Sequence, residues 1–489
     1  MSISVTTYEG VIGLEVHAEI MTASKMFCGC PVVDSTSAEP NTAVCPICLG
    51  LPGTLPVLNR QAVEFGIRVG LALNCTIPPF NQFARKSYFY PDLPKGYQIS
   101  QYEYPIAVNG WLDIDLPDGS TRRVRIRRAH LEEDAGKLTH VDGASLVDLN
   151  RAGVPLLEIV SEADMRTAEE AEAYIRKLRA ILQYLGVNSG DMSKGVLRIE
   201  PNISVRPVGS DEFRTRTEVK NLNSIRSLAR ATAYEIERQI DLYESGGEVR
   251  QATLGWDEAR QVTVVQRVKE SADDYRYFPE PDLPVVEISQ EWIERVRAEL
   301  PELPDAKRER FMRDLGLSRY DASVLTADRA VADYYEAALA TGADPKQVAN
   351  YLTGDVFRHM NLEGRERDDI DAIRLTPQAL GGLVKLVQDG VIHHGMAKKL
   401  LETLYEQGGD PAALVEAQGL AQISDEGAIG AVVARVLDAH PNEVARYHAG
   451  EEKVAKFLMG AAMRELRGKG DPAVVQRLLS EGLDARRVE

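Results

Sequence analysis

Acidic side chains and a histidine alternate with apolar residues in segment 13–19, close to the start of the chain. Side chains of a β-strand point to its two faces in turn, so Glu15, His17 and Glu19 are expected to share one face. Carboxylate oxygens suit a hard cation such as Mg²⁺. The segment therefore predicts a strand that carries a row of metal-binding side chains.

Two later segments repeat this pattern and add cations. Segment 197–206 is expected to place five polar residues on one face of a strand, namely Arg198, Glu200, Asn202, Ser204 and Arg206. Segment 217–221 combines Glu218 with Lys220. Because arginine and lysine suit phosphate while carboxylates suit Mg²⁺, the strands together predict a site that holds a metal ion against a polyphosphate.

An acidic run supports this interpretation. Glu132, Glu133 and Asp134 follow a basic predicted strand, 122–128, and stand at a strand end. Carboxylates this close repel one another unless a cation neutralises them. The alternative is a solvated polar face, which antiparallel sheets commonly have, and for any single strand that is the simpler interpretation. The recurrence of the pattern favours a site.

Four of the five cysteines form two close pairs. Cys28 and Cys30 are separated from Cys45 and Cys48 by fourteen residues. Two such pairs predict a zinc site with four thiolate ligands, whose role would be structural because no coordination position stays open. Two disulfides or unpaired core thiols are the alternatives, and a cytosolic chain disfavours disulfides. Cys75 stands alone and is expected to be a buried small hydrophobe.

The composition limits the classes of protein to which the chain can belong. Its 489 residues suffice for two to four domains. No apolar run approaches the roughly 18 residues of a membrane helix, and residues 1–10 lack the pattern of a secretory signal, so a cytoplasmic location is expected. The net charge of −17 argues against broad nucleic-acid binding but leaves room for a local basic face.

The alternating patterns typical of strands dominate before residue 290. Two helices are predicted among them, at about 167–185 and 224–244, the first with Thr167 as its N-cap. Strands mixed with a few helices, without regular alternation, predict an α+β fold with an antiparallel sheet over residues 1–290.

Amphipathic helical patterns dominate after residue 290. A glycine-rich break near Gly408 divides them into a helical domain, 291–408, and a helical tail domain, 409–489. The last predicted helices carry cations that either contact RNA or form an ordinary solvated face: Lys453, Lys456, Arg464, Arg467 and Lys469.

Long, irregular strings carry a family resemblance. They cover residues 11–17, 88–101, 130–137, 148–151, 158–161, 218–224 and 273–284. On these strings the chain resembles the family formed by the B subunits of the bacterial aspartyl/glutamyl-tRNA amidotransferases. The strings span nearly the whole first half, while the second half matches more loosely, at 320–326 and around 456–472.

The resemblance implies an ATP- and Mg²⁺-dependent ligase whose first domain has a glutamine synthetase-like cradle fold. In this family, the B subunit phosphorylates the side-chain carboxylate of glutamate or aspartate misattached to tRNA(Gln) or tRNA(Asn). Ammonia from a glutaminase subunit then displaces the phosphate, and a small third subunit links the two into a heterotrimer. The helical and tail domains are expected to hold the misacylated tRNA.

The resemblance also implies a set of site residues. Carried over position by position, the family's metal ligands fall on Glu15, His17, Glu133, Glu200, Glu218 and Glu258. Of the residues expected to act in catalysis, four come from this set and two from the strand pattern: Glu15, His17, Glu133, Glu218, Arg198 and Lys220. The residues also suggest Arg198, Lys220 and Arg276 as phosphate contacts, and Lys86 and Tyr88 for the ATP or aminoacyl pocket.

One position departs from the family pattern. Where the family often has aspartate followed by alanine, this chain has Glu200 followed by Pro201. Glutamate is one methylene longer, and proline removes a backbone donor from the strand. The metal shell is therefore expected to shift slightly or to reach Glu200 through a water molecule.

Two other functions stay open at the level of sequence. A carboxylate-phosphorylating ligase for a free small molecule would share the chemistry but would not need the long helical half. A zinc-stapled RNA-binding scaffold without catalysis would have no use for clustered carboxylates beside bound RNA. The dependence of ATP hydrolysis on misacylated tRNA separates the three hypotheses.

Overall fold

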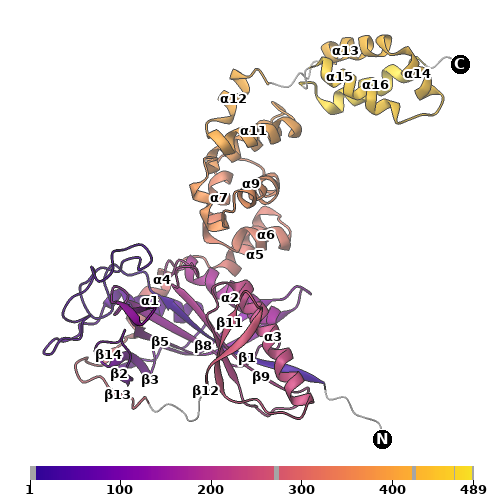
Figure 1. Ribbon diagram of the computed structural model, residues 1–489. Helices are drawn as coiled ribbons and strands as arrows, with labels where there is room; N and C mark the ends of the chain where they lie inside the picture. Colours follow the sequence, from indigo (N-terminus) through magenta and orange to yellow (C-terminus); the bar gives the residue numbers. More distant parts are fainter. Residues whose placement is uncertain (1–6, 269–274, 421–425, 467–468, 487–489) are drawn as a thin grey trace, which may run out of the picture. The chain divides into compact units, whose positions relative to one another are not determined.

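The computed structural model describes residues 7–268, 275–420, 426–466 and 469–486 (Figure 1). The chain divides into two compact units, Met1–Pro304 and Asp305–Glu489. Within the described ranges no helix is both long and apolar enough to cross a membrane. Arg467 and the first two residues of the string 273–284 lie outside the described residues.

One large β-sheet forms the centre of the first unit. Its strands are β1 (Tyr8–Glu19), β2 (Phe80–Ser87), β3 (Tyr97–Tyr104), β4 (Ala107–Asp115), β5 (Thr121–Glu133), β8 (Pro155–Ser161), β9 (Leu197–Pro207), β10 (Thr217–Lys220), β11 (Ala252–Asp257), β12 (Val262–Val268), β13 (Phe278–Pro279) and β14 (Val286–Glu287). They lie in the order β12-β11-β10-β9-β1-β8-β5-β3-β2-β13, with β14 on β2 and β4 on β5. A separate hairpin joins β6 (Lys137–Val141) and β7 (Ala144–Asp148).

Antiparallel pairing prevails among the described strands, and the exception is β10, which lies parallel to β11. Helix α3 (Ile225–Glu244) connects these two strands, and a crossover of this kind is what returns a chain in the same direction. The predicted α+β fold is confirmed, with a sheet that is mixed at this single pair.

The described residues of the first unit also form four helices, α1 (Arg60–Ala72), α2 (Ala168–Tyr184), α3 and α4 (Gln290–Ala298) (Figure 1). The two helices predicted near 167–185 and 224–244 are present as α2 and α3. Thr167 Oγ1 accepts a hydrogen bond from the backbone N of Glu170 at 3.2 Å, and Ser224 caps α3 in the same way. These caps satisfy backbone donors that a helix start leaves free.

The strands turn an apolar face toward these helices. Leu14 of β1 is fully buried in the same cluster as Leu178 of α2 and Leu228 of α3. Burial of one such side chain contributes about 1.5–3 kcal/mol, so the strands are strongly held in this orientation. Because side chains alternate along β1, Glu15 and His17 face the opposite side of the sheet.

The second unit is helical. Its helices are α5 (Pro304–Leu315), α6 (Arg319–Thr326), α7 (Arg329–Leu339), α8 (Pro345–Asn350), a π-helix (Tyr351–Val356), α9 (Phe357–Leu362), a 3₁₀ helix (Arg367–Ala372), α10 (Pro377–Gln388), α11 (His394–Gln407), α12 (Pro411–Ala417), α13 (Glu426–Ala439), α14 (Pro441–His448), α15 (Val454–Glu465) and α16 (Pro472–Asp484). Among its described residues, the buried apolar side chains form two clusters, one from Phe311 to Val415 and one from Ile429 to Leu483.

Candidate active site

The polar face of the sheet gathers acidic side chains and a histidine from four neighbouring strands. The register sets Glu15 of β1 beside Glu200 of β9, and sets His17 beside Glu158 of β8. Ligand atoms of Glu15, His17 and Glu200 lie within 4.8 Å of one another, and so do those of His17, Glu132 and Glu158. These five residues, the carboxylate cluster, could hold a metal ion.

His17 stands at the centre of the carboxylate cluster. Its Nδ1 lies 3.8 Å from Glu132 Oε1 and 3.9 Å from Glu158 Oε2. Its Nε2 lies 3.9 Å from Glu200 Oε2. These separations exceed a direct hydrogen bond, so the groups converge on His17 without hydrogen-bonding to it.

Burial and mutual proximity shift the pKa values of the cluster. Burial raises the pKa of Glu15, and the charge of Glu158 raises it further. Burial by itself lowers the pKa of His17, but Glu132 and Glu158 help to raise it to about 9. Burial would raise the pKa of Glu158, yet His130 and His17 lower it to about 2. The carboxylates thus require positive charge beside them, which an imidazolium or a divalent cation supplies.

Two lysines flank the carboxylate cluster. Lys220 Nζ donates to Glu200 Oε2 at 2.8 Å and lies 3.3 Å from Glu218 Oε1. Burial lowers the pKa of Lys86, but the nearby carboxylate of Glu132 raises it above its ordinary value. The structure therefore places the predicted residues Glu218, Lys220 and Lys86 beside members of the cluster.

Arg198 of β9, a predicted phosphate contact, already has carboxylate partners. Its Nη1 lies 2.8 Å from Asp134 Oδ2 and 3.9 Å from Glu19 Oε1. Asp134 also lies 3.6 Å from Nε of Arg151. Arg198 thus neutralises a buried carboxylate at the end of β5.

Glu133 does not join the carboxylate cluster, in contrast to the prediction. Neighbouring residues of a strand point to opposite faces, so Glu132 and Glu133 of β5 diverge. Glu133 forms an ion pair with Lys95, and its Oε1 accepts a hydrogen bond from the backbone N of Ile99 at 3.0 Å.

Glu258 also lies outside the carboxylate cluster. It follows the end of β11, where its Oε2 accepts hydrogen bonds from Trp256 Nε1 at 2.7 Å and Ser227 Oγ at 2.9 Å. Arg230 Nη1 lies 3.1 Å from its Oε1. These partners hold the side chain near the start of α3.

Two cluster members, Glu132 and Glu158, were absent from the predicted ligands. The fully buried Leu131 precedes Glu132, so the two side chains point to opposite faces of the strand. This alternation could have indicated that Glu132, rather than Glu133, lies on the polar face. Glu158 is a single acidic residue between the fully buried Leu157 and Ile159. A carboxylate in such an apolar segment is rarely placed there without a partner, so its position is itself a signal of a functional site. Their approach to His17 depends on strand order, which alternation does not reveal.

The other predicted pocket residues lie near a group of tyrosines. Tyr88 Oη donates to Gln98 Oε1 at 3.3 Å, and burial raises the pKa of Tyr88. The ring of Tyr275 lies 6.0 Å from that of Tyr88 and 5.0 Å from Lys86 Nζ. Arg276 is exposed and has a left-handed backbone, with a φ of 46°.

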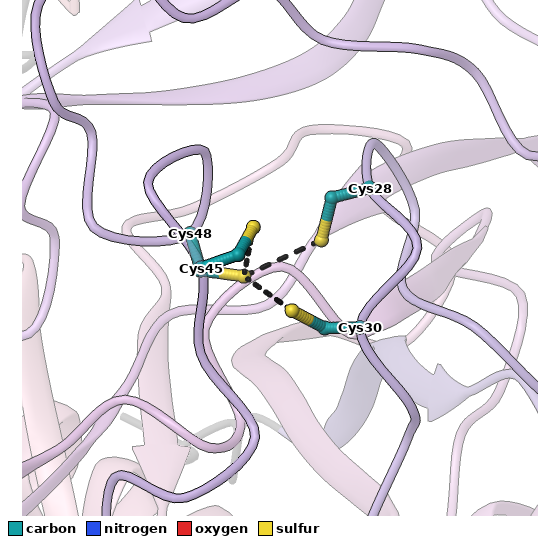
Figure 2. Close-up of side chains that lie close together, drawn as sticks. All are labelled: Cys28, Cys30, Cys45 and Cys48. Atoms are coloured by element: carbon teal, nitrogen blue, oxygen red, sulfur yellow. Dashed lines mark hydrogen bonds between the residues drawn. The ribbon is translucent and has the colours of Figure 1, made fainter.

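The four clustered cysteines converge from two loops (Figure 2). Cys48 Sγ lies 3.4 Å from Cys28 Sγ, 3.7 Å from Cys30 Sγ and 3.7 Å from Cys45 Sγ. Four sulfur atoms about 2.3 Å from one tetrahedral zinc ion would lie about 3.8 Å apart. All four cysteines are free rather than disulfide-bonded, so their geometry fits such an ion.

A buried cation supports this interpretation of the cysteines. Lys25 is fully buried, and its Nζ donates to Cys48 Sγ at 3.6 Å and to the Leu149 carbonyl at 3.2 Å. A buried ammonium needs a negative neighbour, and a set of thiolates provides one.

Comparison with known proteins decides the family. The family model described as "GatB/GatE catalytic domain" matches residues 10–294, and the model described as "GatB domain" matches residues 333–483. The B subunit of the aspartyl/glutamyl-tRNA(Asn/Gln) amidotransferase of Moorella thermoacetica is 54% identical over 480 residues, which cover 97% of this chain and 100% of that protein. The chain belongs to the family of amidotransferase B subunits.

Other amidotransferase B subunits match just as broadly. The proteins of the same name from Brevibacillus brevis and Geobacillus kaustophilus are each 51% identical over 480 residues, covering 98% of this chain and 99% and 100% of those proteins. The family predicted from the sequence is therefore confirmed. The carboxylate cluster and the four cysteines all lie within the region matched by the catalytic-domain model.

Proposed function

We propose that this chain uses ATP to activate the side-chain carboxylate of misacylated Glu-tRNA(Gln) or Asp-tRNA(Asn) and completes its amidation. The observation that carries the proposal is the carboxylate cluster within the region that matches the catalytic-domain model. Ammonia would come from a glutaminase subunit, and a small linking subunit would complete a heterotrimer, as the family resemblance implies. The expected location is the cytoplasm.

The chemistry explains why such a site needs cations more than a nucleophile. A carboxylate is a poor acyl donor to ammonia because it lacks a good leaving group. Transfer of the γ-phosphoryl group of ATP to a carboxylate oxygen releases ADP and gives an acyl phosphate. Ammonia then attacks the carbonyl carbon, phosphate leaves, and the nitrogen loses a proton. The phosphoryl step depends on positioning and charge neutralisation.

The described side chains can meet these requirements. The carboxylate cluster would hold Mg²⁺, which when bound supplies charge neutralisation to the transferring phosphoryl group. Lys86 and Lys220 would place ammonium groups at its flanks, where they would orient the anionic substrate. Glu218, beside Lys220, would keep that ammonium in place.

The other two hypotheses fit the comparisons less well. A ligase for a free small molecule leaves unexplained why residues 333–483 also match a GatB-domain model. A scaffold without catalysis leaves unexplained the catalytic-domain match and the five converging side chains of the carboxylate cluster. Both halves of the chain are therefore assigned to one tRNA-dependent reaction.

We further propose that the four cysteines hold a structural Zn²⁺ ion. Residues 20–59, all of which the structure describes, contain no helix or strand. A connection this long without secondary structure is uncommon. A metal ion bound by the four cysteines would hold this connection in one conformation, because it has no ladder of backbone hydrogen bonds that could do so. The predicted domains 1–290, 291–408 and 409–489 are retained in this proposal, with tRNA bound by the last.

The decisive experiment measures amidation by the complex purified with its partner subunits. ATP hydrolysis and amide formation should both require Mg²⁺ and Glu-tRNA(Gln) or Asp-tRNA(Asn). Correctly charged Gln-tRNA(Gln), which carries no free carboxylate, serves as the control and should stimulate neither. Equal stimulation by free glutamate would instead support the small-molecule ligase.

Removal of the tail is expected to weaken tRNA binding and leave ATP binding nearly unchanged. Val415 packs in the first helical cluster, so a truncation after residue 420 is cleaner than one at Gly408. Lys453, Lys456 and Arg464 are exposed on or beside α15. Loss of these phosphate contacts should raise the KM for misacylated tRNA and lower the salt dependence of binding, by about one slope unit per contact.

A salt series on the truncated and complete complexes measures this effect. A full-length variant with Lys453→Gln and Lys456→Gln serves as the matched control, because it changes charge without removing the fold of the tail. Equal tRNA affinity of the truncated and complete complexes at every salt concentration would show that the tail does not bind tRNA.

A further inference from the structure

Helix α3 carries a buried polar network on the apolar side of the sheet, opposite the carboxylate cluster. The helix packs against β9 and β12 (Figure 1). Glu235, at the centre of the network, is fully buried. Burial of an ionised carboxylate is costly unless hydrogen-bond donors surround it, and acidic residues are rarely found in such a place. The position of Glu235 therefore calls for an explanation.

The donors around Glu235 satisfy both of its oxygens. Its Oε1 accepts hydrogen bonds from Thr217 Oγ1 at 2.7 Å, Arg238 Nη2 at 2.7 Å and Gln239 Nε2 at 2.8 Å. Its Oε2 accepts hydrogen bonds from Arg238 Nε at 2.8 Å and Thr263 Oγ1 at 3.0 Å. Burial by itself would raise the pKa of Glu235, but Arg238 and Gln239 hold that pKa below its ordinary value. These five residues, the α3 network, thus enclose a carboxylate that stays ionised.

The α3 network ties one helix to three strands. Thr217 belongs to β10 and Thr263 to β12. Gln239 Nε2 also donates to Thr217 Oγ1 at 2.9 Å and to the Ile203 carbonyl of β9 at 3.1 Å. Because Thr217 contacts both Glu235 and Gln239, the network holds β10 more closely than the other two strands.

β10 is the strand that most needs such an anchor. It has four residues, and in the described part of the chain it pairs with β9 at two positions, Thr217 with Ile203 and Glu218 with Asn202. Its other neighbour, β11, is parallel, and parallel pairs are slightly less stable. A slip by one residue would turn every side chain of the strand to the other face of the sheet.

The orientation of β10 decides what the carboxylate cluster receives. Thr217 and Val219 are buried on the side of the helices. Glu218 and Lys220 therefore point to the polar face, where Lys220 Nζ donates to Glu200 Oε2 at 2.8 Å. A bond that keeps the Thr217 hydroxyl on the helix side thus also keeps Glu218 and Lys220 beside the cluster.

We propose that Glu235 is a positioning residue, which acts through Thr217 to fix the register of β10 and so holds Glu218 and Lys220 at the carboxylate cluster. The inference rests on the proposed function, in which Lys220 orients the anionic substrate. Glu235 lies on the far side of the sheet and does not touch the cluster. A displacement of about 1 Å that originates far from the reacting atoms can still cost about a hundredfold in rate.

Thr217→Val is the first test, because valine has nearly the shape of threonine and suits a strand but lacks the hydroxyl. The kcat of amidation should fall about ten- to a hundredfold, while the KM for misacylated tRNA stays unchanged. Thr217→Ser keeps the hydroxyl and should retain most of the wild-type kcat. Assays on the complex purified with its partner subunits measure both constants.

Thr232→Val is the matched control for this test. Thr232 is fully buried on the same helix, and its Oγ1 has no hydrogen-bond partner among the described residues. The same chemical change at this position removes no bond of the α3 network, so kcat should equal that of the wild type.

Glu235→Gln provides a second test. Glutamine keeps the shape of glutamate, removes its charge and turns a donor toward the donors of the network. Glu170→Gln is its control, because Glu170 on α2 is also buried and accepts hydrogen bonds from Arg122 Nη1 at 2.7 Å and the backbone N of Arg166, outside the α3 network. Both variants should unfold at a lower temperature, but only Glu235→Gln should lower kcat.

Backbone hydrogen exchange supplies a measurement that does not depend on activity. In the complex without ATP or metal, Thr217→Val and Glu235→Gln should speed exchange at residues 217–220, because the strand opens more often when its anchor is lost. Exchange in β1 and β8 should not change. Glu170→Gln and Thr232→Val should leave residues 217–220 as protected as in the wild type.

The outcomes separate this inference from the proposed function. Wild-type kcat and wild-type exchange at residues 217–220 in both Thr217→Val and Glu235→Gln would overturn the inference, even if the complex amidates tRNA. Equal losses of kcat in the two controls would also overturn it, since they would indicate a general effect of stability. If Glu235→Gln does not fold, the contrast between Thr217→Val and Thr217→Ser decides. A wild-type complex that never amidates misacylated tRNA would instead overturn the proposed function, and the exchange measurement would still decide whether Glu235 anchors β10.

Discussion

The double replacement Glu15→Gln with Glu158→Gln is expected to reduce tRNA-dependent amidation about a thousandfold or more while the chain stays folded. The two carboxylates belong to the two ligand groups that meet at His17. Glutamine keeps the shape of glutamate but removes its charge, so Mg²⁺ loses its ligands and the phosphoryl group loses its neutralising cation, which is worth several kcal/mol. Single-turnover amidation assays on the purified complex measure the loss.

The stability of the single variant Glu15→Gln should respond in the opposite sense to its activity. Glu15 is half-buried beside other carboxylates, so removing its charge relieves repulsion in the metal-free protein. The Asn202 amide, which donates to Glu15 Oε1 at 3.0 Å, keeps an acceptor in glutamine. The single variant Glu15→Gln should therefore unfold at a temperature no lower than that of the wild type, whereas Glu158→Gln should lower it, because Glu158 loses its charge interaction with His130 and His17.

Glu172→Gln on α2, a half-buried carboxylate that pairs with Arg176 outside the carboxylate cluster, is the control. Amidation at the wild-type rate by the double variant would refute the assignment.

The second large effect is expected at the cysteines. Cys28→Ser together with Cys45→Ser should remove the bound metal and destabilise the first unit by several kcal/mol, because residues 20–59 have no backbone ladder of their own. Metal analysis of protein purified without chelator should find about one zinc per wild-type chain and less than about a tenth in the variant.

Cys75→Ser provides the matched control for the cysteine experiment. Cys75 is buried and lies 3.8 Å from the Leu73 carbonyl, apart from the other four cysteines. The same chemical change at this position should leave the zinc content at one per chain. If the wild-type protein itself holds less than about a tenth of an equivalent, the four clustered cysteines are ordinary thiols.

Local pattern alone was enough to place much of the site. Alternation in segment 13–19 determined that Glu15 and His17 share a face, because the period of a strand is two residues and Leu14 must be buried. The spacing of Cys28, Cys30, Cys45 and Cys48 determined that they could meet, because short spacers keep thiols within reach. Of the two long helices of the first unit, α2 was marked by its capping residue Thr167.

Only the tertiary structure decided which residues complete the carboxylate cluster. β8 and β9 lie on either side of β1 although they follow it by more than a hundred residues, so Glu158 reaches His17 through strand order. The pleat of β5 decided that Glu132, and not Glu133, faces the same way. Neither relation has a local signal, because pairing between distant strands depends on the whole sheet.

The structure also decided which cations are free to bind a ligand. The sequence offered no reason to prefer other cations on the strands over Arg198 and Lys220 as ligands of a phosphate group. In the fold each of them lies 2.8 Å from a carboxylate, Asp134 and Glu200 respectively. A sequence determines the charge of a side chain, but its neighbours in space determine whether that charge is already neutralised.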